Sequence, residues 1–277
     1  MTDAFDRCIG IDWSGAAQPG YAGVAVAQCW PGRGAPALVA PPGRAPRWTR
    51  SAVLDWLRRE LDRGERLLAG FDFAFALGAT GLAAPALWAA VEASCAADAD
   101  LLGRRYADGD PRFWQQGACP AGWAPRHRPA EDACVAAGLG HPQSPYQLIG
   151  AKQVGKGALA GMRLLHRLHA ELPDRVAIWP FDAGAGQDAR SVVCEIYPRL
   201  FIRRAGLGNA KLRDRDDLNH VLNGLDSIGL ARGTFDDHQA DALVSAAGLR
   251  QSAGDAALWA AGAGRAEGWI FGVPAGP

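Results

Sequence analysis

Three hydrophobic runs in this chain each contain one acidic residue. The first run (IGIDW) contains Asp12, the second (AGFDF) contains Asp72, and the third (VVCEIY) contains Glu195. Continuous hydrophobic runs of this length are typical of strands that are buried on both faces. A carboxylate in such a strand is destabilising unless it is paired or binds a metal ion. Three acids in the same setting therefore predict a shared site for a divalent cation.

The size and composition of the chain predict a globular protein without a membrane segment. It has 277 residues, of which 49% are hydrophobic, enough to bury a full core. Arg, Asp or Gly interrupts every apolar run before the roughly 18 residues that a transmembrane helix needs. Residues 1–7 lack the charge pattern of a signal peptide. We therefore expect a cytoplasmic protein with no membrane partner, in which the six scattered cysteines are reduced.

The charge of the whole chain does not indicate a nucleic-acid-binding protein, because the formal net charge is zero. Almost all the basic residues are arginines. The only lysines are Lys152, Lys156 and Lys211, and the first two lie in one glycine-rich loop. This placement makes the loop a candidate for binding a charged group.

The pattern of hydrophobic residues predicts alternating strands and helices. Alternation and short turns near the amino terminus indicate an antiparallel meander, and later apolar residues recur at helical spacing. Strands are expected at residues 7–13, 21–30, 37–40, 66–75, 176–181 and 192–197, with 47–49 as a further candidate, and helices at 51–63, 83–97, 157–172, 216–225 and 236–249.

This order of elements matches the connectivity of the ribonuclease H-like fold. That fold is an α/β mixed sheet, in which three antiparallel strands are followed by parallel strands, with flanking helices and a metal site at the strand ends. Many α/β proteins share parts of this order. We expect a single domain over residues 1–277, with an inserted helical or irregular segment at about 78–150.

The helix predicted at residues 236–249 brings further acids. Positions 237, 241, 244 and 248 lie along one stripe of such a helix. Because Val244 and Gly248 are apolar or small, we expect this stripe to face the sheet, which would place Asp241 close to the strand acids. His238 borders the same stripe, and Asp237 begins it.

Each of these residues also has an ordinary structural explanation. Thr234 and Asp237 have the spacing of a capping box, so Asp237 can simply cap the helix. His238 can be a solvated residue of the first helical turn. The two strand aspartates can accept hydrogen bonds from neighbouring turns, and Glu195 can form a salt bridge with Arg199.

Five short motifs are spread over nearly the whole chain: IDWSG at residues 11–15, QLIG at 147–150, EIYP at 195–198, the segment 237–246, and EGWI at 267–270. Together they resemble domain of unknown function family 429, whose members are predicted ribonuclease H-like nucleases. The HQADA sequence within the fourth motif also resembles the His-x-x-Asp-Ala end of Holliday-junction resolvases of the RuvC type.

This resemblance implies a role for most of the acids. Asp12 would be the metal ligand of the first strand, Asp72 the acid of the fourth strand, and Asp241 with His238 the pair on the last helix. Glu195 has no clear counterpart in the resolvase pattern, which leaves its role open.

The glycine-rich loop at residues 150–157 (GAKQVGKG) nearly satisfies the phosphate-loop pattern G-x4-G-K-[ST]. Gly157 stands where the pattern requires Ser or Thr, so a nucleotide-hydrolysing loop is not expected. The free N–H groups of a helix amino terminus, together with Lys152 and Lys156, still suit a phosphate of the substrate. A helix-start turn with solvated lysines is the alternative.

The segment before this loop contains two further candidates. Arginines and aromatic residues in it, such as Arg112, Trp114 and Trp123, can grip single-stranded nucleic acid or pack a small core. Its cysteines and histidines lack the Cys-x2-Cys knuckle of a typical zinc site.

We therefore predict a hydrolase of the nuclease class that uses Mg²⁺ or Mn²⁺ to cleave phosphodiester bonds of DNA or RNA by a two-metal-ion mechanism. One alternative is a phosphotransferase of the actin-like kinase type on the same core, suggested by Ser14; another is a binding module without catalysis. The candidate catalytic residues are Asp12, Asp72, Glu195, His238 and Asp241, the candidate metal ligands are Asp12, Asp72, Asp237 and Asp241, and the candidate phosphate-binding residues are Lys152 and Lys156.

Overall fold

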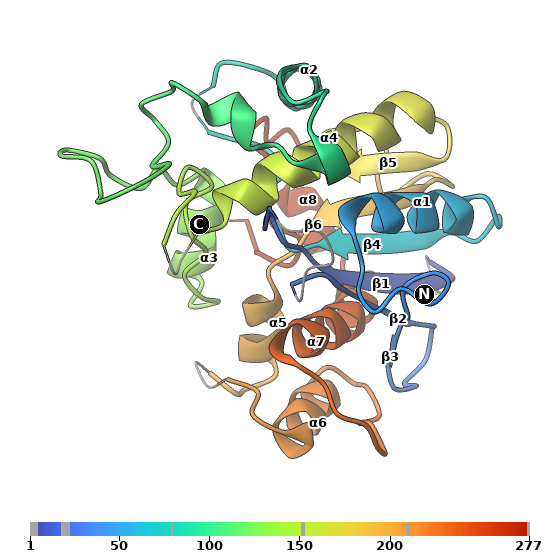
Figure 1. Ribbon diagram of the computed structural model, residues 1–277. Coiled ribbons are helices and arrows are strands. Elements are labelled where there is room, and N and C mark those ends of the chain that lie inside the picture. Colours follow the sequence, from blue (N-terminus) through green and yellow to red (C-terminus); the bar gives the residue numbers. More distant parts are fainter. Residues whose placement is uncertain (1–4, 18–22, 79, 151–152, 209–210, 276–277) are drawn as a thin grey trace.

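A six-stranded mixed sheet, with helices on both faces, forms the centre of the molecule (Figure 1). The computed structural model describes residues 5–17, 23–78, 80–150, 153–208 and 211–275. The strands are β1 (Arg7–Asp12), β2 (Ala25–Cys29), β3 (Ala37–Leu38), β4 (Leu67–Phe71), β5 (Val176–Trp179) and β6 (Ser191–Glu195).

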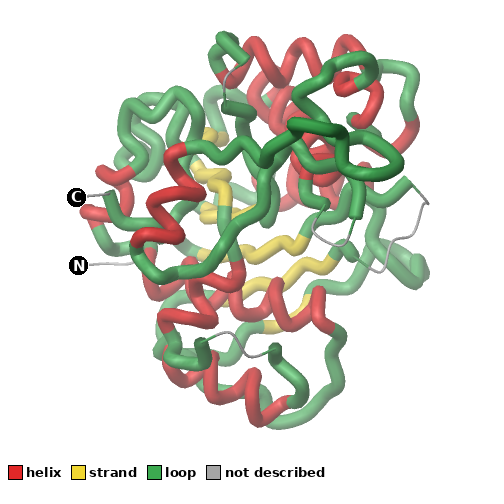
Figure 2. Tube along the Cα trace, turned by 90° about the vertical axis from the view of Figure 1, so that its left-hand side faces the viewer, coloured by secondary structure: helices red, strands yellow, loops and turns green. Residues whose placement is uncertain are grey.

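The helices form the two outer layers, and the strands lie between them when the molecule is turned by 90° (Figure 2). Helices α1, α2 and α4 lie on one side of the sheet, and α5, α6 and α7 lie on the other (Figure 1). The helices are α1 (Arg50–Leu61), α2 (Ala84–Ser94), α3 (Pro129–Ala136), α4 (Gly155–Glu171), α5 (Pro198–Arg204), α6 (Arg215–Gly224), α7 (Asp237–Ser252) and α8 (Ala256–Ala261), with short 3-10 turns η1 (Ala99–Leu101) and η2 (Arg104–Ala107).

The sheet order is β3-β2-β1-β4-β6-β5. Strands β1, β2 and β3 pair antiparallel, whereas β4 pairs parallel with both β1 and β6, and β5 pairs parallel with β6. This confirms the expected mixed α/β sheet flanked by helices. Because β1, β4 and β6 run in the same direction, their carboxyl ends meet at one edge of the sheet.

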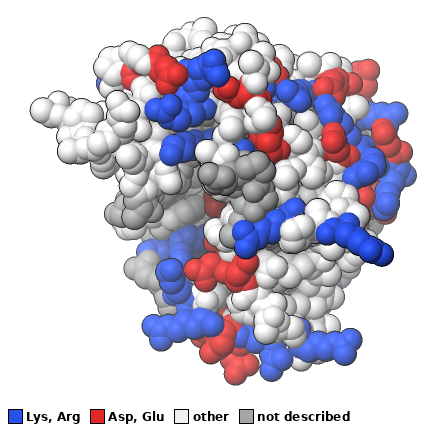
Figure 3. Space-filling model, viewed as in Figure 1, with Lys and Arg blue, Asp and Glu red and all other residues white. Residues whose placement is uncertain are grey.

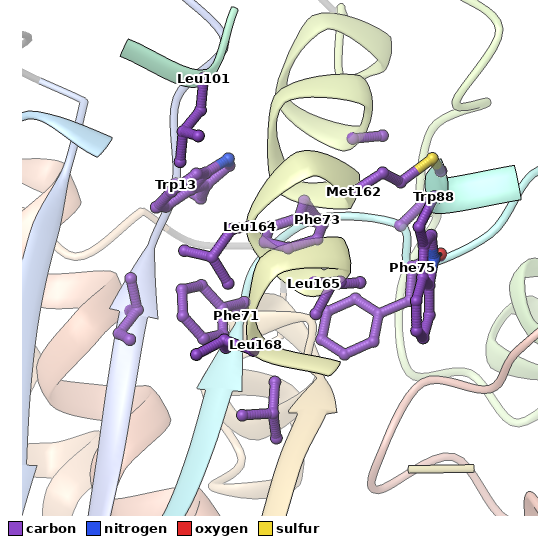
Figure 4. Packing of buried hydrophobic residues seen from close by; sticks show 14 of the residues in the cluster. Trp13, Phe71, Phe73, Phe75, Trp88, Leu101, Met162, Leu164, Leu165 and Leu168 are labelled. Carbon is purple, nitrogen blue, oxygen red and sulfur yellow. Dashed lines mark hydrogen bonds between the residues drawn. The ribbon is translucent and has the colours of Figure 1, made fainter. Parts of the chain in front are cut away.

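Side chains of the central strands alternate between two hydrophobic cores. Ile9, Ile11 and Phe71 belong to the core under α1, α2 and α4, whereas Cys8 and Leu68 belong to the core under α5, α6 and α7. This is the alternation that the pleat of a strand imposes. On the α4 side, the rings of Trp13, Phe71 and Phe73 pack beside the leucines of α4 (Figure 4).

Glycine in the first hydrophobic run allows α7 to approach β1 closely. A Cβ atom on Gly10 would lie 2.3 Å from the carbonyl oxygen of Ala242 and 2.5 Å from the backbone nitrogen of Ala246. A Cβ atom on Gly70 of β4 would similarly lie 2.6 Å from the side-chain atom Cγ2 of Ile196. Gly10 therefore lets the backbone of α7 lie on β1, and Gly70 leaves room for the side chain of Ile196, in both cases two residues before a strand aspartate.

Some expected elements differ from the structure. Residues 47–49 form no strand, and Thr49 instead caps α1 by accepting a hydrogen bond from the backbone nitrogen of Ala52. Within the expected insertion at 78–150, α2 packs in the main core with Leu87, Trp88 and Val91, beside α4. In the described part of the chain, no helix has both the length and the apolar character to cross a membrane.

Candidate functional site

Asp12 and His238 form the centre of the site. Asp12 is the last residue of β1, and His238 lies in the first turn of α7, which packs against that strand. The Nδ1 atom of His238 lies 2.7 Å from Oδ2 of Asp12. This contact raises the pKa of His238, which stays 44% exposed, whereas burial raises the pKa of Asp12 despite the histidine. The sequence predicted His238 as the helix partner of Asp241, and the structure places it in direct contact with Asp12 of the first strand instead.

Asp72 follows β4 directly and lies beside the end of β1. Its backbone nitrogen donates a hydrogen bond of 3.0 Å to the carbonyl oxygen of Ile11, which continues the ladder between the two strands. Burial raises the pKa of Asp72 well above its ordinary value, and the charges of Asp12, Asp241 and Glu195 raise it further. The two strand aspartates are therefore close enough to repel each other.

Asp241 lies one turn after His238 on α7. Burial and the charge of Asp12 raise its pKa to about 7, although Arg199 and His238 act in the opposite direction. The expected helix stripe was wrong in part. Ala242, Ser245 and Ala246 face the sheet at Gly10, whereas a Cβ atom on Gly248 would meet the ring of Phe201 in α5.

Asp72 and Asp241 are partly buried and have no neutralising partner in direct contact among the described residues. Neither carboxylate accepts a hydrogen bond or forms an ion pair within the part of the chain that the structure describes. The nearest favourable charges are those of Arg199 and His238, which act on Asp241 at longer range. Asp12, Asp72 and Asp241 thus lie in one region, and of these three only Asp12 is in direct contact with His238.

Asp237 does not join this group. Its side chain is 69% exposed, and its Oδ2 atom lies 3.5 Å from Nζ of Lys211. The capping box expected at Thr234 and Asp237 was also wrong: Asp236 caps α7 by accepting from the backbone nitrogen of Gln239, whose side chain accepts from the backbone nitrogen of Asp236. The proposed metal-binding role of Asp237 stays a prediction.

Glu195 has a full set of partners, and they differ from the expected one. Its Oε2 atom accepts hydrogen bonds of 2.9 Å from Nη1 of Arg128 and of 2.9 Å from the backbone nitrogen of Phe75. Arg128 also binds Glu131, and all three charged side chains are buried. The alternative of a salt bridge was correct in kind, but the partner is Arg128 rather than Arg199.

A cavity of about 270 Å³ opens beside Asp72. Its wall contains the segments that follow β1, β4 and β6 and the amino terminus of α4. A Cβ atom on Gly23 would lie 3.1 Å from Oγ of Ser14 and 3.4 Å from Cε1 of His238, so the serine of the cavity wall approaches the histidine. The lining residues include Trp13, Ser14, Asp72, Phe73, Gln143, Lys156, Gly157, Glu195, Tyr197 and Ile270.

The glycine–lysine loop reaches this cavity through Lys156. Helix α4 begins at Gly155, and the indole nitrogen of Trp13 donates a 3.2 Å hydrogen bond to the carbonyl oxygen of Gly157. Among the described residues, no carboxylate forms an ion pair with Lys156. Lys152 lies outside the described residues, so its predicted role stays a prediction.

The aspartates suit a divalent cation by their chemistry. Mg²⁺ and Mn²⁺ prefer carboxylate oxygens, and the acids without partners here are carboxylates. However, within the described ranges, no three His, Cys, Asp or Glu side chains already lie close enough together to hold one ion. The site therefore supplies the correct donors, but in this part of the chain they do not form a ready-made cluster.

No protein-family model, no curated protein and no solved structure matches this chain. The fold and the grouping of Asp12, Asp72, Asp241 and His238 therefore rest on the sequence and the structure alone. The resemblance to domain of unknown function family 429 stays a prediction.

Sequence reasoning counted Arg128 among the arginines before the glycine-rich loop that can contact nucleic acid, and missed its pairing with Glu195. Arg128 lies in a segment without hydrophobic periodicity, 67 residues before its partner Glu195. The one available signal was the Arg128–Pro129–Ala130–Glu131 sequence, in which a charged pair spans the start of a helix. Nothing in that signal points to Glu195.

Proposed function

We propose that this chain is a hydrolase that uses Mg²⁺ or Mn²⁺ to cleave phosphodiester bonds in nucleic acid. The observation that carries the proposal is the presence of two partly buried carboxylates without direct partners among the described residues, Asp72 and Asp241, next to Asp12. A divalent cation is the group that would neutralise all three.

The comparison with Glu195 supports this argument. Glu195 lies at the end of β6, in register with Phe71 of β4, and Arg128 neutralises it. Asp72, which follows Phe71 directly, has no such arginine among the described residues. Burial and the neighbouring acids disfavour the charged form of Asp72, and a bound cation would offset both effects, so the raised pKa supports a cation as the missing partner.

The other side chains of the site have roles that their contacts suggest. His238 holds one oxygen of Asp12 and so fixes the orientation of that carboxylate. Asp241, whose pKa is raised to about 7 in the metal-free protein, can hold a proton near neutral pH, and a bound cation would displace that proton. Lys156, in the cavity wall, can bind a phosphate group of the substrate. When bound at these aspartates, a cation would activate water and stabilise the charge of the leaving oxygen.

Cleavage and cation binding should be measured on the same set of variants. We expect Mn²⁺ to bind the native chain in isothermal titration, and Mn²⁺-stimulated cleavage of labelled single- and double-stranded DNA and RNA. Asp12→Asn and Asp72→Asn should each lower cleavage at least 100-fold. Asp55→Asn is the control, because it removes an exposed acid of α1 that lies outside the cavity wall, and it should leave cleavage unchanged.

The outcomes separate the candidate functions. Undiminished cleavage in Asp12→Asn would contradict the proposal. Mn²⁺ binding without cleavage of any nucleic acid would favour the binding module. A rise in melting temperature with ATP, together with transfer of its terminal phosphate, would favour the phosphotransferase.

A further inference from the structure

We propose that the cavity beside Asp72 holds a single nucleotide unit at the end of a strand, with a phosphate at Lys156 and the ring system against the aromatic wall. The inference rests on the proposed function, because it assumes that the bond to be cleaved lies near the aspartates. It goes further by naming what the cavity binds and which part of the nucleic acid enters it.

The size of the cavity selects a small ligand. Pockets for drug-sized molecules have volumes of roughly 300–1,000 Å³, and this one has about 270 Å³. Its wall comes from segments far apart in the sequence, including the residues after β1 and β6, Gln143 and Ile270. A nucleotide unit can enter such a space, whereas a base-paired segment cannot.

The charged residues of the cavity wall indicate where the phosphate would bind. Asp72, Glu131, Glu195 and Lys156 are the charged groups among the described residues that line the cavity. Arg128 neutralises both glutamates, which leaves Asp72 and Lys156 for a ligand. The lysine lies in the first turn of α4, a turn without acidic residues, so its charge and the helix terminus both favour an anion there.

The remaining wall suits a planar ring. Trp13, Phe73 and Tyr197 all line the cavity. The rings of Trp13 and Phe73 are held 5.6 Å apart between centroids, and both pack beside α4 (Figure 4). Because Trp13 and Phe73 are only 7% and 5% exposed, the half-buried ring of Tyr197 is the main surface for a base. An aromatic ring binds bases without discriminating strongly among them, because every base has a stacking face.

The first test measures binding without cleavage. Asp12→Asn protein in EDTA is titrated with AMP, adenosine and inorganic phosphate. We expect AMP to bind at least tenfold more tightly than either of the other two, because only AMP contacts both parts of the wall. Failure of AMP to bind, or equal affinity for AMP and adenosine, would overturn the proposal.

Two lysine variants in the same background locate the phosphate. Lys156→Ala should weaken AMP binding at least tenfold and adenosine binding hardly at all, and Lys156→Arg should restore most of the affinity. Lys211→Ala is the matched control, because Lys211 is exposed and lies outside the cavity wall. An unchanged affinity in Lys156→Ala would overturn the assignment of the phosphate.

The second test asks whether a strand end enters the cavity. A fluorescent AMP analogue is displaced, again in EDTA, by linear and by circular single-stranded DNA of the same sequence. We expect the linear strand to displace the analogue at least tenfold more effectively. Equal displacement would show that an internal nucleotide enters by flipping, and would overturn the choice of a strand end.

These measurements remain informative if the proposed function fails. They require neither a metal ion nor cleavage. If AMP binds as expected but no nucleic acid is cleaved with Mn²⁺, the nucleotide pocket stands and the nuclease proposal falls. If cleavage occurs but AMP does not bind, the nuclease proposal stands and the pocket falls.

Discussion

Two acids at the same edge of the sheet differ in the side chains that surround them. Glu195 is enclosed by Arg128 and accepts a hydrogen bond from the backbone nitrogen of Phe75. Asp72, on the adjacent strand, faces Asp12 and Asp241 across a region in which no described arginine makes direct contact. At the scale of the residue, the edge thus holds one carboxylate with an arginine partner and another without one among the described residues.

Asp241→Asn is expected to stabilise the metal-free protein at alkaline pH. The pKa of Asp241 is about 7 in the folded chain, against an ordinary value of 3.8, so the folded state holds this proton more tightly than the unfolded state. The stability of the native protein should therefore fall as the pH rises from 3.8 to about 7. In the asparagine variant this loss should be smaller by on the order of 1–3 kcal/mol.

Urea unfolding at pH 5 and pH 8 in EDTA measures this difference. Asp55→Asn serves as the control, since its side chain is 62% exposed, and its free energies of unfolding at the two pH values should differ as they do in the native protein. An Asp241→Asn variant that loses as much stability as the native chain between the two pH values would contradict the burial of this charge.

Glu195→Gln is expected to destabilise the fold without removing cation binding. The substitution leaves the buried Arg128 with Glu131 as its remaining carboxylate partner among the described residues, and breaking a buried ion pair typically lowers stability by about 3–5 kcal/mol. Because Glu131 remains, we expect the free energy of unfolding, measured with urea, to fall by about 2–4 kcal/mol. Mn²⁺ affinity at low temperature should stay within about threefold of the native value.

Asp72→Asn is the matched comparison for Glu195→Gln. It should abolish most Mn²⁺ binding while leaving stability in EDTA equal to or above that of the native chain, because it removes a carboxyl group whose charged form is disfavoured by burial and by the neighbouring acids. The opposite pattern, with cation binding lost only in Glu195→Gln, would make Glu195 a ligand.

Much of this site could be predicted from the sequence, but its partners could not. Asp12 and Asp72 were recognisable because an acid inside a hydrophobic run is exceptional, and Asp241 because a helix follows a clear spacing. The partner of Glu195 depended on where an irregular segment folds back, and no local pattern encodes that position. The sequence therefore allowed both a ligand and a salt bridge for Glu195.

At the scale of the elements, contact between α7 and β1 sets the position of the catalytic candidates. His238 and Asp241 reach Asp12 only because Gly10 lets the helix backbone lie directly on the strand. The spacing of hydrophobic residues predicted the helix itself. The face that it turns to the sheet was predicted incorrectly, because Ala242 and Ala246 mark that face by being small rather than by being hydrophobic.

Gly10→Ala is expected to damage both stability and the site. The new Cβ atom would lie 2.3 Å from the carbonyl oxygen of Ala242, so α7 must move away from β1. Overpacking of this kind lowers stability by about 1–3 kcal/mol or more. The same movement should weaken the contact between His238 and Asp12, which would lower the pKa of His238 toward its ordinary value.

Unfolding in urea and NMR titration of the histidines measure the two effects of Gly10→Ala. Gly34→Ala is a suitable control, because a Cβ atom at that position would have no described atom within 4 Å beyond its chain neighbours, and its backbone is not in the left-handed region. That variant should have the stability and the His238 titration of the native protein. A Gly10→Ala protein with native stability and an unchanged His238 titration would refute the close packing.

The elements that the sequence predicted are those with a long hydrophobic pattern. Strands β1, β4 and β6 and helices α1, α4 and α7 all fall where expected. Helices α5 and α8 were missed, because seven and six residues are too few to establish a helical period. Local patterns fail for short elements, which form mainly because the surrounding core favours them.

At the scale of the whole molecule, charge is dispersed rather than concentrated. The chain has 29 basic and 29 acidic residues, and on the face drawn in Figure 3 the two kinds are interspersed. Many arginines pair with acids close by, such as Arg105 with Asp98 and Arg190 with Asp188. A protein of this kind should bind nucleic acid through a few specific contacts rather than through a broad basic surface.

This dispersal predicts a weak dependence of nucleic-acid binding on salt. For single strands, the slope of log K against log[salt] is about −0.7 for each phosphate that the protein neutralises. With Lys156 as the main contact in the cavity, we expect a slope of about −1 to −2 for Asp12→Asn protein in EDTA. Fluorescence anisotropy of a labelled single-stranded oligonucleotide, over a series of KCl concentrations, gives this slope.

Substitution of the lysine then shows whether the slope comes from the cavity. Lys156→Ala should reduce its magnitude by about 0.7, the contribution of one phosphate, whereas Lys211→Ala should leave it unchanged. A slope of about −5 or steeper would mean that many basic side chains contact the backbone at once. That result would mean that an extended basic surface, rather than the cavity, mainly determines the affinity. The chain would then carry a local basic face although its net charge is zero.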